Sequence, residues 1–100
     1  MFQISQGDLL RLEGVSEPVL VVSKDYFNRS EQIIACPFLR NAAPDPLHIT
    51  ISTKDLIGVV LCEQLKLFDL RERGYKKIAG LDISNIMDVT DAIQGIFDYY

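Results

Sequence analysis

The sequence predicts one mainly β domain that ends in a single α-helix. Short apolar runs separated by turn residues fill residues 8–81, and the hydrophobic period changes to a helical one only after them. Many short strands followed by one amphipathic helix are typical of a small curled β-barrel, or of a strongly bent sheet, with the helix on one side. Residues 1–100 contain no repeat and no linker, so we expect a single domain.

Three strands are expected in the first part of the chain. The run "DLLRLE" at 8–13 alternates imperfectly between apolar and polar residues. The run "PVLVVS" at 18–23 is apolar on both faces and β-branched, which indicates a central strand covered on both sides. The run "QIIACPF" at 32–38 follows a polar turn at 28–30 and is the third candidate.

The middle of the chain begins with an irregular segment, because two prolines in "RNAAPDP" at 40–46 interrupt any regular element. The run "LHITIS" at 47–52 then alternates cleanly and places His48 on its polar face, so we expect this imidazole to be exposed. Further strands are expected at 58–65 and 65–70, and a weaker one at 75–81.

The last segment has the period of an amphipathic helix from Ser84 to Tyr100. Asp82 or Ser84 is expected to cap its N-terminus. Gly95 lowers the stability of such a helix by about 1 kcal/mol relative to Ala, which suggests close packing there. The expected apolar stripe consists of Ile86, Val89, Ile93, Ile96 and Tyr100.

Composition narrows the classes of function. The net charge of −4 argues against broad, charge-driven binding of nucleic acid. No apolar run is long enough to span a bilayer and no leader pattern opens the chain, so we expect a cytoplasmic protein. Cys36 and Cys62 lie in apolar runs without metal-ligand spacing. We therefore expect two buried, reduced thiols, no metal and no cofactor.

Three stretches in order, "QGDLLRLEG", "PVLVVSKDYFN" and "GVVLCEQLKLFD", resemble the PemK/MazF family of toxins from type II toxin–antitoxin systems. The resemblance extends from Gln6 to the C-terminus. It implies an SH3-like barrel with a C-terminal helix, a homodimer, and descent from endoribonucleases that cut single-stranded mRNA (mRNA interferases). It also implies an antitoxin partner whose flexible acidic segment covers the RNA groove.

The sequence departs from the family pattern at the positions that carry its chemistry. Typical members have an Arg directly before the "PVLVV" strand, where this chain has Glu17, and they have a much longer loop before it. A hydroxyl is usual where this chain has Leu39 and Arg40. The PemK-type Arg is replaced by Leu61, whereas the nearby acid is retained as Glu63. We interpret the chain as one that keeps the fold while the usual nuclease groups have largely gone.

Metal-free RNA cleavage needs a base, an acid and a donor that stabilises the phosphorane. Three residues remain as catalytic candidates, and each has a structural alternative. Arg40 could reach a phosphate, or it could pair with Asp45. Glu63 could act as a base, or it could be an acceptor that ties a turn. His48, the single imidazole of the chain, could be catalytic, or it could be a solvated surface residue. The residues expected to contact substrate are Glu17, Arg29, Asn41 and Lys66.

Two further features of the sequence each allow two interpretations. One is a group of cations in the later half of the chain, interleaved with Asp69 and Glu72. It is either a solvated mixed-charge face, or a surface that docks an acidic antitoxin segment or RNA phosphates. The cations are Lys66, Arg71, Arg73, Lys76 and Lys77. The aromatic end, including Tyr99 and Tyr100, either fixes the helix to the barrel or forms a contact patch.

The leading functional hypothesis is therefore a toxin or toxin-like protein of the PemK/MazF family. The alternatives are a non-catalytic module on the same fold that binds a protein or a nucleic acid, and a CcdB-like gyrase inhibitor, since that group shares the fold.

Overall fold

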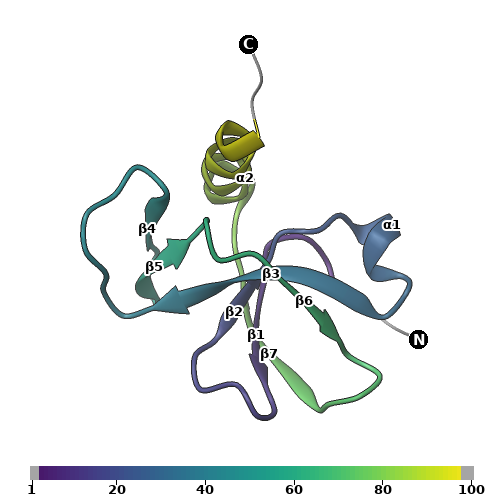
Figure 1. The fold of residues 1–100 in the computed structure, drawn as a ribbon. Coiled ribbons are helices and arrows are strands. Elements are labelled where there is room, and N and C mark those ends of the chain that lie inside the picture. The colour runs from purple at the N-terminus through teal and green to yellow at the C-terminus, as the bar shows by residue number, and fades with distance from the viewer. Residues whose placement is uncertain (1–2, 98–100) are drawn as a thin grey trace.

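The computed structural model describes residues 3–97, whose strands form one bent antiparallel sheet (Figure 1). The strand order is β4-β5-β3-β2-β1-β7, and β6 also pairs with β3. Among the described residues the two ends of this path are not hydrogen-bonded to each other, so the sheet is curled but open. The prediction of a mainly β, barrel-like fold with a C-terminal helix is confirmed. The strands are β1 (Asp8–Leu12), β2 (Val19–Val21), β3 (Gln32–Leu39), β4 (His48–Ser52), β5 (Ile57–Leu61), β6 (Lys66–Asp69) and β7 (Tyr75–Gly80), and the helices are α1 (Asp25–Asn28) and α2 (Ile83–Phe97).

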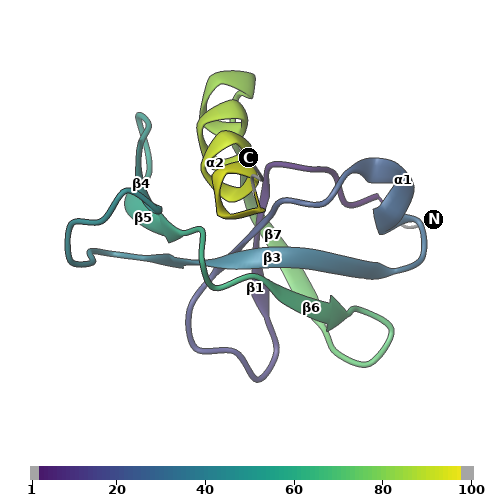
Figure 2. The same ribbon diagram turned by 45° about the horizontal axis from the view of Figure 1, so that its top comes forward.

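Strand β3 connects the two halves of the sheet. Its first half, Gln32 to Ala35, pairs with β6, whereas Phe38 and Leu39 pair with β5. Its other edge pairs with β2. The long strand therefore runs from α1 at one end to the β4–β5 hairpin at the other, as both views show (Figures 1 and 2).

Strand β2 is covered on both faces, as its continuous apolar run predicts. Val19 and Val21 belong to one buried cluster, which the curled β1, β2, β3 and β6 enclose. Leu20 points the other way, into a second cluster between the sheet and α2. Alternation along an extended strand explains this division. The strand is shorter than the predicted 18–23, because only Val19 to Val21 keep ladder pairing.

Helix α2 begins where the capping signal predicts. The Asp82 carboxylate accepts a hydrogen bond from the Asn85 N–H at 3.0 Å and so satisfies one free donor of the first turn. Val89 is 1% exposed and packs with Ile93 in the cluster beneath the helix. The predicted helix is confirmed with a start at Ile83 instead of Ser84.

Two details of the predicted helix are wrong. Ile96 was expected on the buried stripe but is 39% exposed, because it lies beyond the part of α2 that covers the sheet. Gly95 was expected to mark close packing, yet a Cβ built there meets no heavy atom within 4 Å. Tyr99 and Tyr100 lie outside the described residues.

The turn after β2 contains the short helix α1, where the sequence predicted only a turn. Its last residue, Asn28, is fully buried. The Asn28 side-chain amide donates to the carbonyls of Ile4 at 3.2 Å and Ser23 at 3.1 Å, and its oxygen accepts from the Ser23 hydroxyl. This network fastens the N-terminal segment to the sheet and satisfies every polar atom of the amide group.

Cys36 and Cys62 are buried, free thiols, as predicted. Desolvation raises the pKa of Cys36 to about 12 and that of Cys62 to about 11, with smaller contributions from neighbouring negative charge. Neither helix within residues 3–97 has the length and apolar character needed to cross a membrane.

Candidate functional site

A groove of about 400 Å³ opens beside β3, between the β1–β2 connection and the segment from β5 to β6. Among the described residues that line it, the charged side chains are Glu17 and Lys66, and Ser16 and Gln64 are polar. The rest of the lining is apolar: Val15, Val19, Ala35, Pro37, Leu39, Leu61, Leu65 and Phe68. A concave, mainly apolar surface with a few polar groups is the usual form of a binding site.

The alternation of β3 shapes the floor of this groove. Ala35, Pro37 and Leu39 line it, whereas Cys36 and Phe38 lie in the cluster beneath α2. Pro37 has no backbone N–H, so it leaves no donor unpaired where β3 passes from its pairing with β6 to its pairing with β5. The same strand thus supplies the core on one face and the candidate site on the other.

Two cations lie against one wall of the groove. The Lys66 ammonium lies 5.7 Å from the centre of the Phe68 ring, and the Arg73 guanidinium lies 5.4 Å from it. Arg73 also donates to the Glu13 carbonyl at 3.1 Å. These cation–π contacts hold positive charge at the Phe68 end of the groove.

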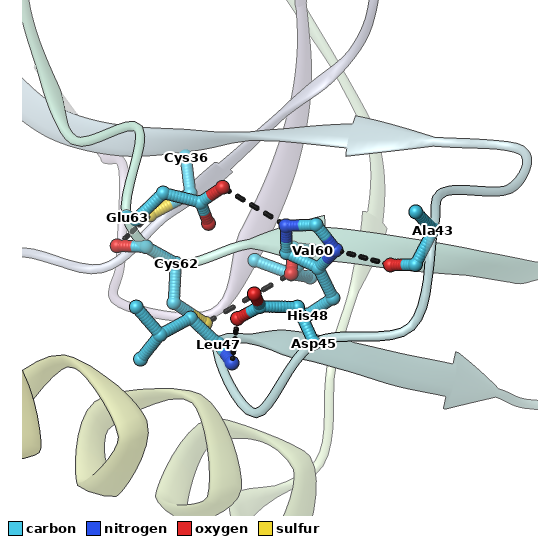
Figure 3. Close-up of polar contacts among 8 residues, drawn as sticks. All are labelled: Cys36, Ala43, Asp45, Leu47, His48, Val60, Cys62 and Glu63. Atoms are coloured by element: carbon cyan, nitrogen blue, oxygen red, sulfur yellow. Dashed lines mark hydrogen bonds and ion pairs between the residues drawn. The ribbon is translucent and has the colours of Figure 1, made fainter.

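His48 and Glu63 form the second part of the site (Figure 3). His48 opens β4, and its cross-strand partner in β5 is Leu61, which lines the groove. The ring Nε2 lies 2.9 Å from a Glu63 carboxylate oxygen, and the ring Nδ1 lies 2.6 Å from the Ala43 carbonyl oxygen. Since Gln64 follows Glu63 in the chain and lines the groove, the pair lies at the groove's edge.

The expectation that His48 is exposed is wrong. Its side chain is 15% exposed and is fixed at both ring nitrogens. The hydrogen bond to Glu63, followed by that to the Ala43 carbonyl, raises the pKa of His48 above its ordinary value. The expectation that Glu63 is a structural acceptor agrees with this contact, although its partner is a side chain and not the turn's own backbone.

The other predicted site residues lie elsewhere. Arg40 and Asn41 are exposed in the loop after β3 and do not line the groove. No ion pair within residues 3–97 joins Arg40 to Asp45, whose carboxylate accepts from the Leu47 N–H at 2.9 Å. Arg29 lines a separate polar cleft of about 460 Å³ near α1.

The mixed-charge face is partly paired. Arg71 binds Asp69 at 2.8 Å, and the hydrogen bonds from Arg71 lower the pKa of Asp69 to about 2. Lys77 pairs with Asp8 at 3.1 Å. In the part of the chain that the structure describes, no three His, Cys, Asp or Glu side chains gather in a way that could hold a metal ion.

The sequence did not point to Gln64 and Phe68 as parts of the site, whereas Arg73 was predicted only as one cation of a mixed-charge face or docking surface. The pattern predicts Phe68 only as one apolar residue of a strand. Its place beside Lys66 is visible in the alternation of β6, whereas the contact that Arg73 makes with the ring from the following loop has no local signal.

The sequence matches a family model, and the fold matches solved structures. A model for the family described as PemK-like, MazF-like toxins of type II toxin–antitoxin systems matches residues 11–97. No curated protein matches the sequence significantly.

Solved structures share the fold at low identity. A MazE–MazF structure from Deinococcus radiodurans superposes with a TM-score of 0.86 and 23% identity, covering 97% of this chain and 98% of that one. An endoribonuclease in complex with its cognate antitoxin from mycobacterial species gives a TM-score of 0.83 and 16% identity, with 95% of each chain covered. Toxin MazF-mt6 from Mycobacterium tuberculosis gives 0.73 and 16% identity, over 94% of this chain and 98% of that one.

Proposed function

Because this chain belongs to the PemK-like, MazF-like family of type II toxins, we propose that it is a toxin-like protein with altered or lost RNA cleavage. Its groove binds an antitoxin segment. The observation that carries this proposal is the charge of the groove, where Glu17 and Lys66 are the charged residues of the lining that the structure describes. Glu17 stands where the family resemblance implies an Arg.

The groove is poorly equipped for phosphoryl chemistry. Stabilising a phosphorane requires a cation or several donors aimed at its oxygens. The Glu17 carboxylate repels a phosphate, and Lys66 is directed over Phe68. Arg40, the other candidate cation, lies outside the groove lining.

The His48–Glu63 pair is also poorly placed to act as a base. Both ring nitrogens of His48 face acceptors, so neither has a lone pair free for the proton of a 2′-hydroxyl. Glu63 is 37% exposed and already accepts from the ring. This arrangement supports a structural role for the pair.

The partner we propose is an antitoxin with an acidic, flexible segment. Two of the similar structures are described as MazE–MazF and as an endoribonuclease with its cognate antitoxin, which supports a partner of this class. The apolar floor suits the apolar side chains of an extended peptide, and Lys66 and Arg73 suit its carboxylates. We also propose a cytoplasmic homodimer organised as one domain over residues 1–100.

The test is a cleavage assay with purified protein and single-stranded RNA, together with growth after induced expression. We expect no cleavage above the buffer control, no growth arrest, and a stable complex with the acidic half of an antitoxin encoded beside this gene. Cleavage that co-purifies with the protein and disappears in Glu63→Gln would overturn the proposal. The matched control is Glu72→Gln, an exposed acid in the β6–β7 loop.

One observation favours a second candidate, a retained endoribonuclease. Contact with Glu63 raises the pKa of His48 and so favours the imidazolium, the form that holds a proton that a leaving 5′-oxygen requires. If this candidate is correct, RNA cleavage should fall with rising pH, and His48→Gln should abolish it. The cleavage assay thus separates the two functions.

A further inference from the structure

The His48 ring joins two segments that are separate in the chain. The loop 40–47 approaches it through the Ala43 carbonyl oxygen, 2.6 Å from Nδ1. The turn after β5 approaches it through the Glu63 carboxylate, 2.9 Å from Nε2. Figure 3 shows the ring between these two partners.

Both partners of the ring are acceptors. A backbone carbonyl has no proton to donate, and an ionised carboxylate has none either. Neutral imidazole carries one N–H and can satisfy only one of them, whereas imidazolium carries two. The geometry therefore requires the doubly protonated ring for both contacts to exist together.

The charges that act on the ring favour its protonated form. Glu63 contributes from the turn after β5, and Asp45 contributes from the loop 40–47. The thiols of Cys36 and Cys62 lie in the core nearby, but burial raises their pKa values to about 12 and about 11, so they stay neutral over the range in which His48 titrates. The two side-chain charges that act on the His48 ring are therefore both negative.

The two joined segments border the groove. Leu39 lines the groove and directly precedes the loop 40–47, while Leu61 and Gln64 line it on either side of Glu63 in the chain. A backbone hydrogen bond from the Cys62 N–H to the Leu47 carbonyl, 2.9 Å long, holds the base of the loop independently of the ring. The ring holds the part of the loop beyond that point.

We propose that His48 is a pH-sensitive clamp that, when protonated, ties the loop 40–47 to the turn after β5 and so fixes this edge of the groove. On deprotonation the ring keeps one contact and releases the other. His48 is a positioning residue in this role. The clamp goes beyond the proposed function, because it holds whether or not the groove cuts RNA.

The direction of the pH effect follows from the raised pKa of His48. The folded protein binds this proton more tightly than the unfolded chain, where the pKa of His is about 6.5. The clamp's contribution to stability is therefore fully present below that value. It is lost as the pH rises through the higher pKa of the folded state.

The test is an NMR titration of the ¹⁵N-labelled protein. His48 is the chain's single histidine, so its ring signals need no assignment by mutation. We expect both ring nitrogens to be protonated at neutral pH, with a midpoint above the ordinary value. Above that midpoint, we expect amide protection factors in the loop 40–47 to fall severalfold, and the methyl signals of Leu39 and Leu61 to shift with the same midpoint.

Two variants complete the test. Glu63→Gln keeps the shape of the side chain but removes its charge, so the midpoint should fall and the loop should lose protection at neutral pH. Glu72→Gln makes the same chemical change away from the ring and should leave the midpoint unchanged. The proposal is wrong if one ring nitrogen is unprotonated at neutral pH with an ordinary midpoint, or if Glu63→Gln leaves that midpoint in place.

Discussion

The Lys77 ammonium lies 3.1 Å from the carboxylate of Asp8, whose side chain is only 6% exposed. A one-residue register shift between β1 and β7 makes this contact possible. Lys77, and not Ile78, stands opposite Leu10, so it shares a face with Asp8. The second Asp8 oxygen accepts from the Ser5 N–H at 2.9 Å.

This relationship predicts a stability cost at a site remote from the groove. Asp8→Ala should lower the free energy of unfolding by about 2 kcal/mol, because it leaves the Ser5 N–H and the Lys77 ammonium without their acceptor. Lys77→Ala should cost about 1 kcal/mol or more, and the exposed neighbour Lys76→Ala should stay within about 0.5 kcal/mol of the parent. Urea unfolding measures all three, and equal midpoints for the two Lys variants would contradict the prediction.

Two glycines should respond in opposite directions to the same substitution. A Cβ at Gly58 would lie 2.7 Å from the Leu39 carbonyl oxygen and closer still to the Phe38 ring, so Gly58→Ala should destabilise the protein by about 2 kcal/mol or more. A Cβ at Gly95 meets nothing within 4 Å inside α2, so Gly95→Ala should stabilise it by about 1 kcal/mol. Thermal unfolding checks both. A destabilising Gly95→Ala would show that this helix face is covered.

The charge of the groove predicts a gain of RNA binding. Glu17→Arg replaces the lining anion with a cation near Lys66, so the affinity for a short single-stranded RNA should rise about three- to tenfold at low salt. The gain should shrink as salt is added, because phosphate contacts release counterions. Glu72→Arg makes the same change outside the groove and serves as the control in fluorescence anisotropy. An equal gain in both variants would assign the effect to net charge alone.

The two thiols predict an alkaline limit to stability. Burial raises the pKa of Cys36 to about 12 and that of Cys62 to about 11, whereas an unfolded thiol ionises near about 8.5. The unfolded state then releases these thiol protons first, so the contribution of the two thiols to stability should be constant below about pH 8 and fall as the pH rises toward 11. Urea unfolding at pH 7 and pH 10 measures the difference. Rapid reaction of the native protein with a thiol reagent at pH 7 would contradict the burial on which this rests.

The sequence predicted those parts of the fold whose signals are local. The apolar run of β2, the alternation of β4, and the cap and first part of the stripe of α2 each occupy one continuous segment, and each is found close to its expected place. Helix α1 was missed because its four residues are held by the contacts of Asn28 with Ile4 and Ser23, and no periodicity reveals such contacts.

The site was less predictable because it depends on register. Glu17 and Lys66 are separated by about half of the chain, and the pairing of β2 and β6 with β3 brings them to one groove. His48 falls on the polar face of β4, as predicted. The polar face does not mean exposure here, since Ala43 and Glu63 cover the ring from loops whose geometry the residue pattern does not encode.

The pairing of β1 with β7 also sets the order of events during synthesis. Leu12 finds its partner Tyr75 only after about 60 more residues have left the ribosome, so the edge of β1 stays unpaired for roughly 3 to 12 s at ordinary elongation rates. Throughout that interval the nascent chain exposes a template onto which another strand could add. A strand from another chain would therefore meet an unfinished sheet before it met the finished one.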